Sequence, residues 1–204
     1  DSAFGEYEIL FYGQPTIKEK IGNLKIDISA NSFFQTNTIQ GEKLYEQIVK
    51  AAGLSGDEVI YDLYCGIGSI SLYLAPHAKA VYGFEIIRSA LEDAEKNAEK
   101  NSISNVWFFK ANLNTYFKKG QLPKRLPKPN IVIVDPPRAG LHPHLAHYLP
   151  KLKADRIIYV SCNPATQARD SRILTENGYS IHRSVMVDMF PHTPHIEMVL
   201  LFEK

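Results

Sequence analysis

The sequence predicts an α/β fold built around a mainly parallel sheet. Short apolar runs alternate with amphipathic segments from about residue 57 onward, a pattern typical of parallel strands covered by helices. A glycine-rich turn directly follows the first of these runs. Two extended runs, 179–187 and 196–202, end the chain without a helix-forming segment between them, so we expect them to pair antiparallel.

The individual elements follow from the same patterns. The predicted buried strands are Val59–Leu63, Ala80–Glu85, Val106–Phe109, Ile131–Val134 and Ile157–Val160. A helix is expected over 38–52 with Gly53 as its stop, and a second over 87–98 from its apolar face. A third helix should start at Pro164, capped by Asn163, and stop at Gly178.

The first thirty residues differ from the rest. Residues 7–28 look like short strands with turns at Gly13 and at Gly22-Asn23. We expect residues 1–30 to be a β arm that remains from an upstream β-rich domain, and residues 31–204 to form the main domain. The chain starts at Asp1 without an initiator Met, so we expect it to be part of a longer protein.

Composition narrows the class of protein. The 204 residues suffice for one substantial domain, and their net charge of +1 does not indicate a nucleic-acid partner. No apolar run approaches the ~20 residues of a membrane span. Two cysteines suit a reducing cytoplasm, where we place the protein. Residues 118–128 carry five basic side chains and no acid, which indicates a solvated loop or a loop that contacts phosphates.

The stretch YDLYCGIGSI, residues 61–70, predicts a ligand loop. Gly66 begins a Gly-x-Gly turn that lets backbone approach a ligand closely, although Ser71 stands where a third glycine completes a dinucleotide fingerprint. Glu85 ends the next strand, about 20 residues on, where an acid binds ribose hydroxyls. Asp62 either shares in the site or orders the loop by accepting backbone hydrogen bonds. The sequence therefore predicts an adenosine site.

A second loop, DPPRAG at 135–140, follows the fourth predicted strand. Ligands bind at the carboxyl ends of central strands in open α/β sheets, so Asp135 is placed at the reaction centre. A turn-forming Asp135 with Arg138 on the surface is the alternative. Amine methyltransferases carry a similar loop with an aromatic residue where Arg138 stands. Together with the antiparallel end, the pattern resembles a class I methyltransferase (Rossmann-like) fold.

Cysteine and carboxylate placement suggest a further chemistry. Methylation of uracil C5 requires a thiolate that adds to C6, a methyl donor, and a base that removes the C5 proton. Cys162 follows the fifth strand and precedes a helix start, which we expect to lower its pKa. From position alone, Cys162 fits a core thiol equally well. Cys65 is the rival, but it lies in the glycine loop.

The base is expected near the start of the last strand. Glu197 begins an otherwise apolar run, an unusual position for an unpaired carboxylate. His192 and His195 are alternative candidates for the base. If neither is the base, we expect each to make an edge contact or to position the substrate.

Five motifs together resemble one known family, the RNA uracil-C5 methyltransferases, which form 5-methyluridine. They are SFFQTN, DLYCGIGSISL, DPPRAGLHP, VSCNPATQARD and DMFPHTPHIEMVLLF, in the family's order from about residue 30 to the C-terminus. The bacterial 23S rRNA branch looks most similar. This resemblance implies S-adenosylmethionine as the methyl donor, Cys162 as the nucleophile and Glu197 as the base. It also implies cofactor contacts at Gln35, Tyr64, Gly66, Glu85, Asn112 and Asp135, a looser one at Ser69, and a substrate contact at Phe33.

The resemblance also sets expectations about partners. We expect a structured RNA substrate, rRNA rather than tRNA, and a monomer that binds no membrane. Relatives carry an N-terminal TRAM barrel and often a four-cysteine iron–sulfur site; two cysteines cannot hold such a cluster, so we expect no metal here. An RNA cytosine-C5 methyltransferase and an inactive module that binds the cofactor and docks on RNA are the alternatives. DPPRAG lacks the second cysteine of the cytosine enzymes.

Overall fold

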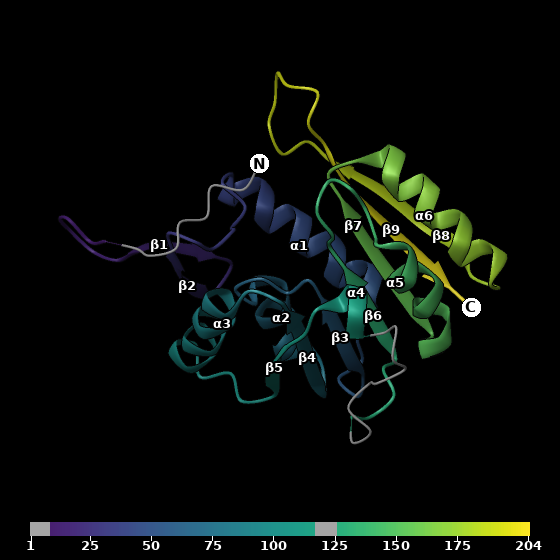
Figure 1. Cartoon of the computed structure of the whole chain (residues 1–204), viewed down its shortest axis with the longest axis horizontal. Coiled ribbons are helices and arrows are strands. Elements are labelled where there is room, and N and C mark those ends of the chain that lie inside the picture. Colours follow the sequence, from purple (N-terminus) through teal and green to yellow (C-terminus); the bar gives the residue numbers. More distant parts are fainter. Residues whose placement is uncertain (1–8, 117–125) are drawn as a thin grey trace.

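The computed structural model describes residues 9–116 and 126–204 and contains a seven-stranded sheet (Figure 1). Its strand order is β5-β4-β3-β6-β7-β9-β8, and β9 runs in the opposite direction to the other six strands. The strands are β3 (Val59–Leu63), β4 (Ala80–Glu85), β5 (Val106–Lys110), β6 (Ile131–Val134), β7 (Arg156–Ser161), β8 (Ser180–Val187) and β9 (Glu197–Glu203). The predicted α/β class and the antiparallel strand pair at the C-terminus are confirmed.

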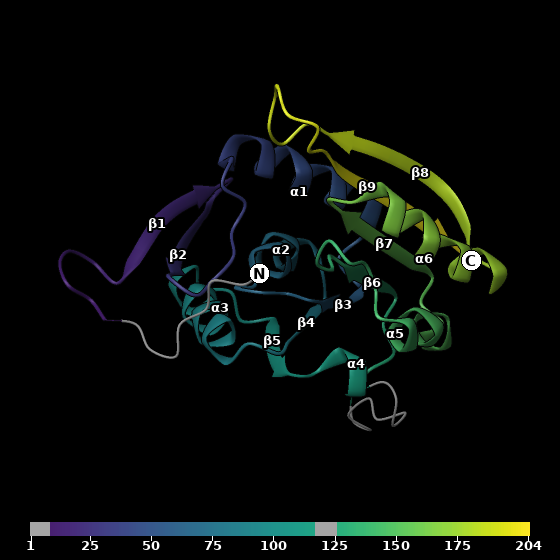
Figure 2. The same cartoon turned by 45° about the horizontal axis from the view of Figure 1, so that its top comes forward.

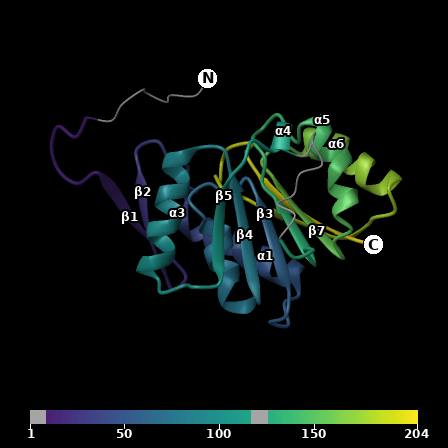
Figure 3. The ribbon, with the colours of Figure 1, turned by 60° about the horizontal axis from the view of Figure 1, so that its bottom comes forward.

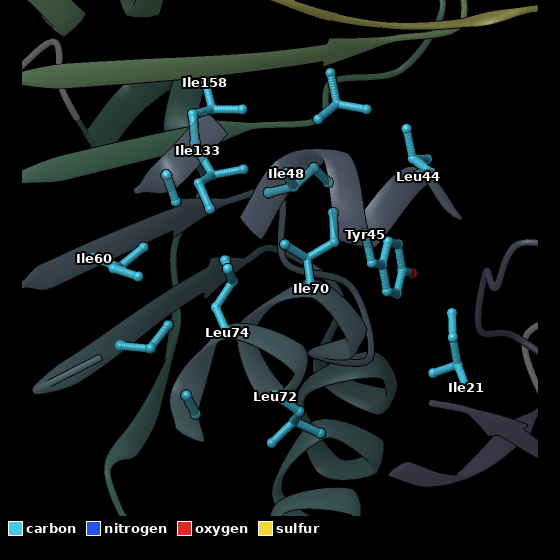
Figure 4. Close-up of a cluster of buried hydrophobic side chains, with 14 of the residues drawn as sticks. Ile21, Leu44, Tyr45, Ile48, Ile60, Ile70, Leu72, Leu74, Ile133 and Ile158 are labelled. Carbon is cyan, nitrogen blue, oxygen red and sulfur yellow. The ribbon is translucent and has the colours of Figure 1, made fainter. Parts of the chain in front are cut away.

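Helices cover both faces of the sheet, whose strands lie side by side in Figure 3. One face packs against α1 (Thr38–Ala52), α2 (Ser69–Leu74) and α3 (Arg88–Lys100). The other packs against α4 (Leu113–Tyr116), α5 (Pro143–Tyr148) and α6 (Pro164–Glu176). Side chains alternate along each strand, so Ile133 of β6 joins the first core and Val134 the second. Figure 4 shows Ile48, Ile70 and Ile133 meeting in the first core.

The strand order reverses direction between β3 and β6. The chain leaves β3 toward β4 and β5 on one side, and it leaves β6 toward β7 on the other. The loops after these two strands therefore separate and leave room at their carboxyl ends, which is where open α/β sheets bind ligands. Both loops singled out in the sequence, 64–68 and 135–140, start at this point.

Helix ends follow the predicted signals. The N-cap side chain of Asn37 accepts from Gln40 N, and Gly53 ends α1 with a φ of 54°. Asn163 caps α6 by accepting from Ala165 N. The stretch 61–70 also predicts a helix start directly after its Gly-x-Gly turn, and α2 begins there at Ser69. The short helix α5 lies in a segment for which we specified no element, because its six residues are too few for a helical period to stand out.

The predicted N-terminal strands form one hairpin, β1 (Thr16–Ile21) and β2 (Leu24–Ser29), joined at Gly22-Asn23. Gly13 lies at a bend before β1. The hairpin lies beside α3 at the end of the molecule away from β8 (Figure 2). Asp27 N donates to Asn97 Oδ1 of α3 at 2.8 Å, and Ile26 is fully buried. The hairpin thus shares the main core, while its origin in an upstream domain stays a prediction.

Candidate active site

A cavity of about 530 Å³ opens at the carboxyl ends of β3 and β6. It gathers residues from the loop before α1, the glycine loop, the ends of β4 and β6, and the starts of α6 and β9. These residues include Phe33, Gln35, Tyr45, Tyr64, Cys65, Gly66, Ser69, Glu85, Ile86, Asp135, Arg138, Cys162 and Glu197. Nine of the ten site residues that the resemblance implies therefore line one cavity, and Asn112 is the exception.

The glycine loop wraps tightly around the end of β4. Tyr64 and Gly66 both have positive φ, 73° and 54°, and no atom lies within 4 Å of the position that a Gly66 Cβ would occupy. Gly66 N donates to Glu85 Oε2 at 3.2 Å, while Glu85 Oε1 accepts from Ile86 N at 2.6 Å and Ile87 N at 2.9 Å. Glu85 is thus a fixed acceptor at the rim of the loop.

Asn112 lies in a smaller cavity of about 60 Å³ that adjoins the main one. The two cavities share Tyr64, Glu85 and Ile86 as walls. Ile86 is 49% exposed, so it offers an apolar surface that a planar ring could cover. Asn112 is therefore reachable by a ligand that passes over Glu85.

Asp62, at the end of β3, does not line the cavity. It is fully buried and accepts from Ser71 Oγ at 2.5 Å. Burial raises the pKa of Asp62 to about 6, against the lowering effect of the Ser71 hydrogen bond. Of its two carboxylate oxygens, Oδ1 has no hydrogen-bond partner. Asp62 therefore holds the start of α2, which follows the glycine loop directly, through Ser71.

Cys162 is half-buried at the cavity wall, between the end of β7 and the start of α6. Burial raises its pKa, Glu197 and Asp135 raise it further, and Arg138 lowers it. The expectation of a lowered pKa is therefore wrong, because burial and two carboxylates outweigh the helix start. Arg138 is the nearby cation that opposes them.

Glu197 begins β9 and is 8% exposed. Its Oε2 has no hydrogen-bond partner, and burial raises its pKa to about 7 while Arg138 lowers it. Near neutral pH this carboxylate therefore exists in both protonation states, as a general base requires. Burial also raises the pKa of Asp135 well above its ordinary value, with Glu197 and then Asp62 adding to the effect.

A second cavity, of about 300 Å³, continues from the first past Cys162 and Glu197. Its other walls include Phe33, Phe190 and His195. Phe33 is 73% exposed, so the face of its ring is accessible from this cavity. His195 therefore reaches the site, whereas His192 has a positive φ of 72° and lines neither cavity.

The rival thiol, Cys65, lies in a different environment. It is buried, and its Sγ would be 2.9 Å from a Cβ at Gly83. Burial raises its pKa well above the ordinary value, and Asp62 and Glu85 add to this. Both cysteines touch the main cavity, but the second cavity reaches Cys162 alone.

Arg138 and Tyr45 are among the wall residues for which the sequence predicted no role in the site. Arg138 is exposed, as the alternative interpretation of this loop expected, and it also lines both cavities and acts on Cys162 and Glu197. Its position directly after two prolines at a strand end is the signal that could have found it. Tyr45 Oη of α1 lies 2.7 Å from Ser69 Oγ and shares a hydrogen bond with it, which the sequence did not predict.

Other predictions meet the structure only in part. Of the basic stretch 118–128, residues 118–125 lie outside the described residues. Within the described ranges, no group of three or more His, Cys, Asp or Glu residues could hold a metal ion. Among the helices that are described, none is long and apolar enough to cross a membrane.

Comparison with known proteins assigns the family. The family described as tRNA (Uracil-5-)-methyltransferase matches residues 16–204. An uncharacterized RNA methyltransferase of Chlorobaculum tepidum is 47% identical over 99% of this chain and 42% of its own length. One from Clostridium acetobutylicum is 45% identical over 98% of this chain and 43% of its own length. The chain thus spans less than half of these relatives.

Solved structures agree with this assignment. The Pyrococcus abyssi tRNA (uracil-54, C5)-methyltransferase in complex with S-adenosyl-L-homocysteine has a TM-score of 0.80 and 35% identity, over 98% of this chain and 48% of that one. The M. jannaschii tRNA m1G37 methyltransferase shares the fold alone, with a TM-score of 0.68 at 16% identity, over 94% of this chain and 57% of that one. The predicted class I methyltransferase fold is confirmed. The chain belongs to the tRNA (uracil-5-)-methyltransferase family.

Proposed function

We propose that this chain binds S-adenosylmethionine and methylates C5 of a uridine in structured RNA, with Cys162 as nucleophile and Glu197 as base. The observation that carries the proposal is the shared wall. Cys162 and Glu197 face two joined cavities, one of which also holds the glycine loop and Glu85. A methyl donor and a flipped base can therefore reach the same two side chains from different sides.

The main cavity fits the cofactor. Gly66 leaves open space beside the loop, and the Glu85 carboxylate stands where it can accept from ribose hydroxyls. Ile86 and the small cavity with Asn112 offer an apolar wall and an amide to the adenine. Gln35, Tyr64 and Asp135 line the remaining length. When bound, S-adenosylmethionine supplies an electrophilic methyl group.

The second cavity fits the target base. A uridine must leave its stack to be modified, and an exposed Phe33 ring provides a surface on which the base can stack. Cys162, Glu197 and Arg138 surround the same space. The uracil edge that carries C5 and C6 can therefore face both the thiol and the carboxylate.

The chemistry follows from these positions. The Cys162 thiolate adds to C6, and the C5=C6 electrons move to the C4 carbonyl oxygen as an enolate. C5 thereby becomes a nucleophile that takes up the methyl group. Glu197 then accepts the C5 proton, the C5=C6 bond reforms, and the C–S bond breaks to return the thiolate. Arg138 favours both ionised side chains, because it lowers the pKa of each.

Trapping the covalent intermediate tests the proposal. RNA that contains 5-fluorouridine, mixed with the protein and S-adenosylmethionine, should give a band that resists denaturation, because fluorine cannot leave as a proton. The band should vanish in Cys162→Ser and persist in Cys65→Ser. The reverse pattern would move the nucleophile to Cys65. If the wild type and both variants give no band, the result would favour a module that only docks on RNA.

The proposal also names the class of RNA that is methylated. We propose ribosomal RNA, on the resemblance of the five sequence motifs to that branch, and cytoplasmic monomers as the acting form. Mass spectrometry of rRNA and tRNA from cells that lack the full-length gene should show 5-methyluridine lost from rRNA. Loss from tRNA alone would overturn this choice, and loss of 5-methylcytosine would favour the cytosine-C5 alternative.

A further inference from the structure

The helix that follows Cys162 presents one polar face to the 135–141 loop and to strands β7 and β9. Asn163, Thr166, Gln167 and Asp170 are spaced by three or four residues, so they share one side of α6. Gln167 and Asp170 are 0% and 2% exposed, which is unusual for side chains of their type in a helix. Each of the four binds backbone outside its own helix or caps its start. The reaction as proposed gives Asp170 no role.

The first turn of α6 holds the loop that carries Arg138. Asn163 Nδ2 donates to the Arg138 carbonyl at 3.0 Å, and Thr166 Oγ1 donates to the same oxygen at 3.3 Å. The backbone of Arg138 is therefore attached directly to the helix that starts beside Cys162.

Asp170 holds the far end of that loop. Its Oδ2 accepts from Leu141 N at 2.7 Å and from Tyr159 Oη at 2.8 Å, and its Oδ1 accepts from Arg169 Nε at 2.8 Å. Arg169 Nη2 also donates to the carbonyl of Ala139 at 3.1 Å. A buried carboxylate thus joins the loop, strand β7 and helix α6 at one point.

The close approach at this point requires a glycine. A Cβ at Gly140 would lie 2.7 Å from Asp170 Oδ2 and 2.7 Å from Arg169 Nη2. The positive φ of Gly140, 79°, is a second reason for glycine there. Loop and helix therefore fit together as one rigid unit.

Gln167 extends the connection to the strand of the base. Its Nε2 donates to the Tyr159 carbonyl at 2.8 Å and to the Met198 carbonyl at 3.2 Å. Tyr159 lies on β7, and Met198 directly follows Glu197 on β9. The same face of α6 thus contacts the segments that carry Arg138, Cys162 and Glu197.

We propose that Asp170 is a positioning residue, which anchors Leu141 and so holds Arg138 beside Cys162 and Glu197. The proposal rests on the proposed function for its meaning in catalysis. Its geometry does not depend on RNA or on methyl transfer. Loss of the carboxylate should let the 135–141 loop move and should increase the mean distance from Arg138 to the thiol.

The rate of Cys162 alkylation measures this effect without RNA and without methyl transfer. The charged groups that act on Cys162 are Glu197, Arg138 and Asp135. Iodoacetamide reacts with the thiolate, and peptide mapping by mass spectrometry separates Cys162 from the buried Cys65. Asp170→Asn should slow Cys162 alkylation about three- to tenfold at pH 7.5, because a more distant Arg138 no longer favours the thiolate. Direct loss of the Asp170 charge would act in the opposite direction and speed alkylation.

A double-mutant cycle shows whether Asp170 acts through Arg138. Arg138→Gln alone should slow alkylation, and adding Asp170→Asn should change the rate no further. Additive effects, or faster alkylation in Asp170→Asn, would overturn the proposal.

A milder pair of variants keeps the test decisive if Asp170→Asn does not fold. Tyr159→Phe removes one donor to Asp170, and Tyr179→Phe removes an equally buried 2.8 Å hydrogen bond to the Ala154 carbonyl at a distance from this unit. Only Tyr159→Phe should slow Cys162 alkylation; equal rates in the two variants would contradict the proposal. If the 5-fluorouridine band fails while the alkylation cycle holds, the proposed reaction is wrong and the positioning role stands.

Discussion

Cys162 and Glu197 are the residues next to the last registered pair of the β7–β9 ladder, in which Ser161 lies opposite Met198. Because β9 runs antiparallel to β7, the end of one strand and the start of the other meet at the same edge of the sheet. Backbone pairing therefore brings together a thiol and a carboxylate that are 35 positions apart in the sequence. Their proximity does not depend on a flexible loop.

Replacing the base should stop the reaction at the covalent stage. With Glu197→Gln, we expect a Cys162 adduct to accumulate on RNA that contains ordinary uridine, because the C5 proton has no acceptor. Denaturing gels with labelled RNA would measure it. Glu203→Gln, at the other end of β9, is the matched control and should turn over normally. Complete turnover by Glu197→Gln would exclude Glu197 as the base.

The rate of methylation should rise with pH through about 7, the pKa to which burial raises Glu197. The carboxylate must be deprotonated to accept a proton, and the thiol must ionise as well, so acid protonates both. We expect a fall of about fivefold or more between pH 7 and pH 6, measured as kcat. Adduct formation by Glu197→Gln should lack the step near pH 7. A wild-type profile that is flat from pH 6 to 8 would contradict the assignment.

Cofactor affinity should depend on the Glu85 carboxylate. In Glu85, one carboxylate oxygen accepts from Gly66 N and the other accepts from Ile86 N and Ile87 N. Glu85→Gln replaces one of these oxygens by an amide NH2, which cannot accept, so either the Gly66 hydrogen bond or the pair from Ile86 and Ile87 is lost together with the negative charge. We expect binding of S-adenosylmethionine to weaken about 10- to 100-fold, as for loss of a hydrogen bond to a charged group. Calorimetry with Glu92→Gln, an exposed glutamate on α3, provides the comparison. Unchanged affinity in Glu85→Gln would place the ribose elsewhere.

Two glycines allow backbone strain to be separated from crowding. Gly140 and Gly178 have similar φ, 79° and 88°, but a Cβ meets atoms within 3 Å at Gly140 and nothing within 4 Å at Gly178. Gly178→Ala should cost about 1 kcal/mol from its conformation alone. Gly140→Ala should cost roughly 2 to 5 kcal/mol, because the clash with Asp170 is added. Urea unfolding measures both, and equal losses would show that the loop yields without cost.

The fold was predicted well where the hydrophobic period of a segment agrees with the residues that mark its ends. β4 keeps its predicted bounds, and α6 starts at Pro164 as its cap and proline indicate. The short helix α5 was not predicted, because six residues show no helical period. The pKa of Cys162 was predicted with the wrong sign, because a helix start is visible in the sequence whereas burial and the approach of Glu197 are not. Arg138 was underrated for the same reason, since its contacts come from other parts of the chain.

The register of β9 has a consequence for how this family can diversify. Glu197 is held by the ladder behind it, and the segment 188–196 in front of it connects β8 to β9 and supplies Phe190 and His195 to the second cavity. Insertions, deletions or new side chains in that connection can reshape the mouth of the second cavity while the position of the carboxylate stays fixed. Selection for a different RNA can therefore act on this connection independently of selection for the chemistry.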